Sequence, residues 1–155
     1  MATTGVRHLF VDTNVLVYAT DANSPWQGAA TSALEGWRRA GTQLCLSVQV
    51  LREYLAVVTR PAPGQTTPPD WTAILANLAA FRAQFLVLED TGPVAEELAR
   101  LAQQFAVRGR QIHDANLVAV MRRSGVRDLL THNTADFTRF SALIQVHPLV
   151  LATPS

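Results

Sequence analysis

The stretch that most constrains the fold lies near the N-terminus, where the apolar run Leu9–Val11 ends in Asp12, Thr13 and Asn14 and the sequence then turns apolar again. A short apolar run of this kind is typical of a buried parallel strand, and here its C-terminal tip carries polar groups. Ligands bind at such strand tips in open α/β sheets. We therefore predict that Asp12 is the first ligand of a divalent-metal site.

The rest of the chain alternates between short apolar runs and amphipathic segments. Further strands are expected at residues 43–46, 85–88, 128–131 and near 143–146. Helices are expected to begin after Ser24, Ser47, Asp70, Thr91 and at about His113, with a turn or short helix at Thr134–Phe140. Residues 61–69 hold four prolines and read as a surface loop and possible lid. This alternation predicts an α/β fold with a mostly parallel sheet, helices on both faces and right-handed crossovers.

Size and composition favour one globular domain over residues 1–155. Hydrophobic residues make up 48% of the chain and charged residues only 16%, which is typical of a compact core. No apolar run approaches the roughly 20 residues that span a bilayer. Residues 1–8 are too polar for a signal peptide, so a cytoplasmic location without membrane association is expected. A single cysteine, Cys45, rules out an internal disulfide and a cysteine-based zinc site.

The kind of positive charge is more informative than the net charge of +1. All 13 basic residues are arginine, so P-loop phosphate binding and Schiff-base chemistry, which need lysine, are excluded. Arginine suits bidentate contacts with phosphate. A GC-rich genome that favours arginine codons explains the same composition equally well.

Three further acids stand where an apolar residue or an ordinary turn is expected. Glu53 lies within a strongly apolar helix, where an ion pair with a distant arginine is the ordinary explanation. Asp114 shares a helix face with Leu117 and Val118 but also lies in the first turn, where a carboxylate often caps. Asp136 follows a predicted strand and is, taken alone, an ordinary turn residue.

Taken together with Asp12, these residues suggest a shared site, because the carboxyl ends of parallel strands meet at one edge of a sheet. Converging carboxylates repel one another and raise one another's pKa. A hard divalent cation relieves that repulsion, and an all-oxygen ligand set suits Mg²⁺ or Mn²⁺ rather than zinc. We therefore predict that Asp12, Glu53, Asp114 and Asp136 hold one or two such ions.

Four segments, in order along the chain, resemble the PIN-domain nucleases and, within them, the VapC-like toxins of bacterial toxin–antitoxin pairs. They are residues 11–16, 47–54, 113–119 and 131–137. The resemblance implies a three-layer α/β/α fold with a five-stranded sheet in the order 3-2-1-4-5. It also implies a metal-dependent endoribonuclease that leaves a 5′-phosphate and a 3′-hydroxyl.

The resemblance assigns roles to individual residues. The four acids match the family's acidic quartet, and the polar positions around it correspond to Thr13, Asn14, Ser47, Thr131 and Asn133. One metal would lower the pKa of a bound water and polarise the phosphate, and a second would lie about 3.5–4 Å away. Some members have an acid in place of Asn133, so whether a second ion is held without substrate stays open.

The same resemblance implies partners. These are an RNA substrate, a small antitoxin whose tail fills the active-site groove, and a second copy of the chain in a homodimer. The helices at 26–39 and 48–58 offer apolar surface for the antitoxin, although core packing explains it equally. Weak candidates for RNA phosphate contacts are Arg52, Arg108, Arg110 and Arg139. His113 and His132 are expected to pack or contact RNA, and the three tryptophans to lie in the core or an interface.

A haloacid-dehalogenase-like phosphatase also begins with an aspartate at a strand tip, but it needs a second aspartate two residues on, where this chain has Asn14, and a downstream lysine. A PIN-like module that binds RNA or protein without cleavage remains an alternative. So does an RNA-processing nuclease that has no antitoxin.

Overall fold

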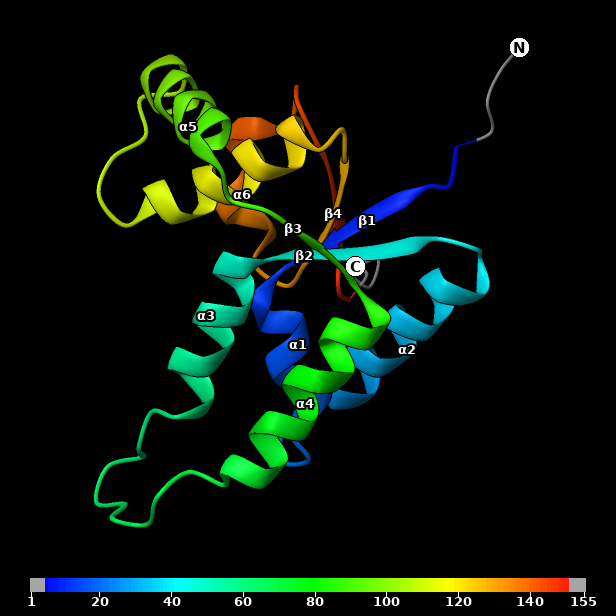
Figure 1. Ribbon diagram of the computed structural model, residues 1–155, viewed down its shortest axis with the longest axis vertical. Coiled ribbons are helices and arrows are strands. Elements are labelled where there is room, and N and C mark those ends of the chain that lie inside the picture. The colour runs from blue at the N-terminus through cyan, green and yellow to red at the C-terminus, as the bar shows by residue number, and fades with distance from the viewer. Residues whose placement is uncertain (1–4, 151–155) are drawn as a thin grey trace, which may run out of the picture.

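A computed structural model describes residues 5–150 of the chain and shows one five-stranded sheet (Figure 1). Its strands are β1 (His8–Val11), β2 (Gln43–Ser47), β3 (Leu86–Leu88), β4 (Asp128–Thr131) and β5 (Gln145–Pro148). They are all parallel and lie in the order β3-β2-β1-β4-β5. The predicted fold class and strand order are confirmed.

Helices cover both faces of the sheet. They are α1 (Thr13–Thr20), α2 (Gln27–Arg39), α3 (Val48–Val58), α4 (Trp71–Gln84), α5 (Gly92–Gln104), α6 (Gln111–Arg123) and the 3₁₀ helix η1 (Thr134–Phe140). In Figure 1, α5 and α6 lie on one side of the sheet and α1 to α4 on the other, which gives three layers. Between residues 5 and 150, no helix has the length and apolar character that a membrane crossing requires.

The central strand β1 explains why the N-terminal apolar run is so informative. Leu9, Phe10 and Val11 are fully buried, because β1 is flanked by β2 and β4 and covered by helices on both faces. Phe10 is in register with Cys45 on one side and Leu129 on the other. The Cys45 side chain is a buried free thiol. A strand buried on both faces can be apolar throughout, which is why the polar break at Asp12 marks its end.

Helix α1 was missing from the sequence prediction, which placed no helix directly after the first strand. Asp12 has extended backbone angles and caps α1, with its Oδ1 atom accepting a hydrogen bond from the Thr13 N–H at 2.8 Å. The β-branched residues in α1 have low helix propensity, so its sequence resembles a continued strand. As a result Thr13 and Asn14 lie in the first turn of a helix.

Several element boundaries differ from the prediction, including one-residue shifts at the end of β2 and the start of β3. Helix α2 begins at Gln27 instead of directly after Ser24, because the Ser24 hydroxyl accepts from the N–H of Trp26 in a turn that precedes the helix. Helix α6 begins at Gln111, two residues before the expected start. Strand β5 spans Gln145–Pro148, because the turn after η1 still holds Leu143 through a hydrogen bond to Phe140.

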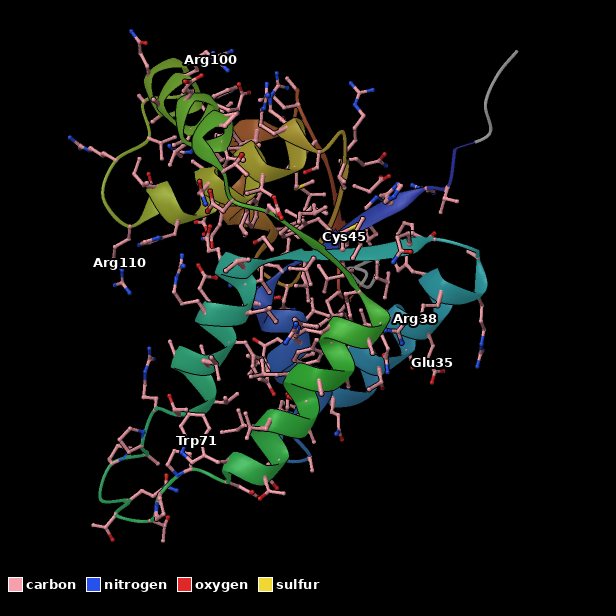
Figure 2. The ribbon with its side chains drawn as sticks, in the orientation of Figure 1. Glu35, Arg38, Cys45, Trp71, Arg100 and Arg110 are labelled. Atoms are coloured by element: carbon pink, nitrogen blue, oxygen red, sulfur yellow. The ribbon has the colours of Figure 1, made fainter. Side chains whose placement is uncertain are left out.

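The tryptophans were expected in the core or an interface, and of the three the structure packs only Trp37 against the core. Trp71 and Leu75 on α4 are 49% and 59% exposed, so they are not core residues, although Ile74 and Phe81 of the same helix are buried. Figure 2 shows Trp71 at the start of α4. Trp26 is also exposed, whereas Trp37 is half-buried against the core. The apolar stripe of α4 is therefore wider than the face it buries.

Candidate active site

A cleft of about 520 Å³ opens beyond the C-terminal end of β1 and gathers residues from four separate segments of the chain. All four predicted acids line it: Asp12, Glu53, Asp114 and Asp136. The polar lining also includes Thr13, Asn14, Asn133, Arg60 and Arg110. Residues more than 120 positions apart in sequence thus share one cavity.

Asp12 is the most buried of the four acids, with 7% of its surface exposed. Its Oδ2 atom accepts hydrogen bonds from the Thr131 hydroxyl at 2.8 Å and from the Asn14 amide at 3.2 Å. Burial raises the pKa of the Asp12 carboxyl to about 6, and the charges of Glu53 and Asp136 add to the rise although the hydrogen bonds oppose it. The charged form of Asp12 is therefore less favourable in the cleft than it would be in water.

Asn14 connects the first turn of α1 to the end of β4. Its Oδ1 atom accepts the backbone N–H of His132 at 3.1 Å, and its Nδ2 atom donates to the Thr131 hydroxyl at 3.3 Å as well as to Asp12. Three neighbouring polar residues thereby orient one carboxylate. An aspartate at this position would lack the amide donor and would add charge beside Asp12.

Glu53 reaches the cleft from α3 and is half-buried. Its Oε2 atom accepts a hydrogen bond from the Thr13 hydroxyl at 2.8 Å, and its Oε1 atom accepts one from the Gln49 amide at 2.7 Å. Both oxygens are therefore held by neutral donors. The sequence prediction included Thr13 but missed Gln49, since an amide one helical turn before an acid is a common pattern.

Asp114 enters the cleft from the first turn of α6. The pKa of its carboxyl is raised to about 7, chiefly by burial and also by repulsion from Asp136, Asp12 and Glu53, while the charge of Arg139 opposes the rise. Asp136 is exposed and lies in η1, just after β4. The charges of the neighbouring acids therefore contribute to the raised pKa of Asp12 and of Asp114, as expected from the sequence.

The arginines are arranged differently from the prediction. Within residues 5–150, none lies within 4.0 Å of a carboxylate oxygen of the four acids. Of the four arginines proposed to contact RNA, Arg110 lines the cleft, and Figure 2 shows it at the turn that begins α6. Arg60, which the prediction missed, lines it from the end of α3. Arg52 and Arg108 are exposed and do not contribute to the cleft lining found in this part of the chain.

Arg139 acts near the cleft without lining it. Its guanidinium donates to the side chain of Gln111 at 2.9 Å and to the backbone oxygen of Phe105 at 3.4 Å. The Arg139 charge lowers the pKa of Asp114, which places it within electrostatic range of that acid. Arg139 therefore secures η1 against the start of α6.

Ser47 and Thr131 are buried supports and are not exposed to the cleft. The Ser47 hydroxyl caps α3 by accepting the Val50 N–H at 3.4 Å, and Ser47 is fully buried. Thr131 is also fully buried and contacts Asp12 directly. Ser47 sets the start of α3, whereas Thr131 orients the Asp12 carboxylate.

His132 packs between two aromatic rings beside the cleft. Its ring centroid lies 4.6 Å from that of Trp26 and 5.5 Å from that of Tyr18, which itself lines the cleft. This packing agrees with the expectation that His132 packs instead of carrying a proton. His113 is exposed, and its backbone oxygen accepts a hydrogen bond from Gln49.

The donor set fits a hard divalent cation in its chemistry. Carboxylate and amide oxygens line the cleft, and no salt bridge within residues 5–150 involves any of its four acids. The side chains nevertheless stand further apart than the ligands of a single ion, since residues 5–150 contain no group of three acid, histidine or cysteine side chains in that geometry. Both oxygens of Glu53 are turned to Thr13 and Gln49.

The family model described as PIN domain matches residues 9–143. Ribonuclease VapC24 of Mycobacterium tuberculosis is 33% identical over 138 residues, which cover 85% of this chain and 90% of that protein.

Solved structures give the same picture of the fold. The crystal structure of VapBC2 from Rickettsia felis bound to a DNA fragment from their promoter aligns with a TM-score of 0.68 at 16% identity, over 91% of this chain and 98% of that one. The crystal structure of Mycobacterium tuberculosis VapC20, a Sarcin-Ricin loop cleaving toxin, aligns with a TM-score of 0.63 at 20% identity, over 88% and 96% of the two chains.

Proposed function

This chain belongs to the PIN domain family, and we propose that it is a metal-dependent endoribonuclease that acts as the toxin of a toxin–antitoxin pair. The observation that carries the proposal is the set of four acids in one cleft that holds no compensating ion pair among the described residues. Without a bound cation, repulsion among these carboxylates only lowers the stability of the fold, so their presence points to a bound ligand of positive charge.

The four acids are the proposed ligands of Mg²⁺ or Mn²⁺. Such an ion, when bound, supplies positive charge beside the scissile phosphate and lowers the pKa of water. Thr131 and Asn14 hold the Asp12 carboxylate at a fixed place, and Thr13 and Gln49 do the same for Glu53. Asn133 supplies a neutral polar group at the rim of the cleft.

RNA is the proposed substrate because the curated relative VapC24 is a ribonuclease. Arg60 and Arg110 line the cleft and are free of ion pairs within residues 5–150, so their guanidinium groups are available to bind phosphates. They stand at the ends of α3 and α6, the two helices that carry Glu53 and Asp114. Phosphate binding and the acids therefore share the same cleft.

The direct test is cleavage of RNA by the purified protein in Mg²⁺ or Mn²⁺. We expect the wild type to cut and the variants Asp12→Asn and Asp114→Asn to lose cleavage. Glu35→Gln, which neutralises an exposed acid on α2, serves as the control and should cut normally. If the wild type cuts no RNA with either metal yet binds RNA or a protein partner, the chain is a non-catalytic module.

The toxin role needs a separate test, because an RNA-processing nuclease would pass the first one. Solved relatives in this fold include a toxin–antitoxin complex from Klebsiella pneumoniae. We expect growth arrest when the chain is expressed, no arrest with Asp12→Asn, and relief on co-expression of a short adjacent reading frame. RNA cleavage without growth arrest would favour the processing nuclease.

A further inference from the structure

Gln49 is a buried amide whose contacts reach two of the acid-bearing helices. It is only 2% exposed and lies in the first turn of α3, one turn before Glu53. Its Nε2 atom donates to the Oε1 atom of Glu53 at 2.7 Å and to the backbone oxygen of His113 at 2.9 Å. Its Oε1 atom accepts a hydrogen bond from the Asn116 amide at 2.6 Å.

This network leaves the Gln49 amide one orientation. Both Nε2 hydrogens are used, and a flipped amide would place its oxygen against the Glu53 carboxylate and the His113 carbonyl. Asn116 fixes the same orientation from α6, since it donates to Gln49 and also to Asp90 at 2.8 Å. Hydrogen bonds that hold a buried amide in one orientation rigidify its surroundings.

The partners of Gln49 are the groups that fix the spacing of the acids. Glu53 is one of the four, and His113 directly precedes Asp114 in the first turn of α6. One amide therefore holds the Glu53 carboxylate and the backbone next to Asp114 at a set separation. The other oxygen of Glu53 is bonded to Thr13, which follows Asp12.

We propose that Gln49 is a positioning residue that sets the distance between Glu53 and Asp114 and thereby the affinity of the cleft for a divalent cation. The inference rests on the proposed function, since it takes the four acids as ligands. Gln49 acts through Glu53 and the start of α6, which its amide contacts directly. Groups that orient metal ligands typically change metal affinity by about 10–100-fold when removed.

The experiment measures Mn²⁺ binding to the RNA-free protein by calorimetry, with Mn²⁺ electron paramagnetic resonance as a second readout. Gln49→Met keeps the length of the side chain but makes no amide hydrogen bonds. We expect its Kd for Mn²⁺ to rise about 10-fold. Asn77→Leu is the matched control, because Asn77 donates to the Tyr54 hydroxyl on the far side of α3, outside the cleft lining. Its Kd should not change even if its melting temperature falls.

A double-variant cycle separates positioning from general stability. If Gln49 acts through Glu53, Gln49→Met should weaken Mn²⁺ binding much less in a Glu53→Gln background than in the wild type. Asn116→Ala removes the donor that orients Gln49, together with the hydrogen bond to Asp90, and should shift the Kd in the same direction by a smaller factor. If Gln49→Met does not fold, Asn116→Ala still tests the role of Gln49.

The outcomes keep the two proposals apart. Unchanged Mn²⁺ affinity in a folded Gln49→Met or Asn116→Ala protein overturns the role of Gln49 and leaves the nuclease proposal intact. Mn²⁺ binding that depends on Gln49 in a protein that cuts no RNA supports the role of Gln49 and contradicts the nuclease. A wild type that binds no Mn²⁺ overturns both.

Discussion

The buried carboxylate of Glu97 on α5 and the carboxylates of the cleft have opposite electrostatic surroundings. Glu97 on α5 is 9% exposed and accepts hydrogen bonds from Arg122 at 2.7 Å and from Arg100 at 2.8 Å. These arginines hold the pKa of the Glu97 carboxyl below its ordinary value. Asp12 and Asp114 have no such partner within residues 5–150, and their pKa values are raised.

The contrast is sharpest within α6, which carries Asp114 in its first turn and Arg122 in its last. The arginine end of the helix is neutralised inside the molecule by Glu97, and the acid end is left open to the cleft. A carboxylate paired within the chain stabilises the fold, whereas unpaired carboxylates in one cleft favour a ligand that brings positive charge. Burial alone does not distinguish the two roles.

The largest expected effect comes from neutralising an unpaired acid. Asp114→Asn should lower RNA cleavage by about 10³-fold or more, because charge stabilisation at a metal site accounts for several kcal/mol of the barrier. The same change should raise the melting temperature of the metal-free protein, since it removes repulsion within the cleft. Cleavage assays and thermal melts in a chelator check the two results. A loss of stability in Asp114→Asn would instead mean that Asp114 stabilises the fold, as Glu97 does.

The second effect is a pH dependence with opposite signs for the two groups. The pKa of Asp12 is raised to about 6, so the folded protein binds this proton more tightly than the unfolded chain. Stability of the metal-free protein should therefore fall as pH rises from about 4 to about 7, by about 3 kcal/mol for Asp12 alone. The lowered pKa of Glu97 acts in the other direction, and its contribution is lost as pH falls below about 4.

Urea unfolding in a chelator between pH 4.5 and 8 measures this dependence, with Asp12→Asn as the comparison. The variant should show a shallower decline than the wild type, and added Mn²⁺ should reverse the decline in the wild type. Identical pH profiles for the two proteins would mean that Asp12 titrates as an ordinary aspartate.

The third effect belongs to the paired acid. Glu97→Gln should lower the free energy of unfolding by about 2 kcal/mol, because it weakens two hydrogen bonds to charged groups. RNA cleavage by the folded variant should stay close to that of the wild type. Chemical denaturation and the cleavage assay together test the division of roles. A large loss of cleavage with little loss of stability would break it.

The smallest effect concerns the arginines of the cleft. Arg60→Ala and Arg110→Ala should each raise the KM for RNA about 5-fold and weaken its salt dependence, because each removes one phosphate contact. Arg108→Ala provides the control, since Arg108 is exposed and does not line the cleft. Equal effects at all three positions would mean that RNA binds over a broad basic surface.

The sequence was sufficient to predict much of the sheet and the membership of the cleft. The apolar run before Asp12 predicts β1, and the resemblance to PIN domains predicts the strand order, which the structure confirms. All four acids line the cleft as expected, and their roles as metal ligands stay a prediction. These signals are readable because Asp12, Glu53 and Asp114 interrupt apolar patterns and Asp136 follows a predicted strand.

The rest depended on contacts that leave no local pattern. Gln49 bonds to the backbone of His113, 64 residues away, and a carbonyl oxygen carries no sequence signature. Helix α1 is set by the cap at Asp12 against the low helix propensity of its own residues. Arg60 was missed because an Arg-Pro pair at a helix end indicates only where the helix stops.

The backbone of Asp12 still takes part in the sheet, since its N–H donates to the oxygen of Leu130 on β4 at 3.0 Å. The cleft is accordingly asymmetric in stiffness. One wall is continuous with the hydrogen-bonded centre of the protein, and the other walls are α3, the start of α6 and the segment that begins η1. Any inward movement that brings the acids to bonding distance of an ion therefore falls to these three segments, with the first aspartate as the stationary point of reference.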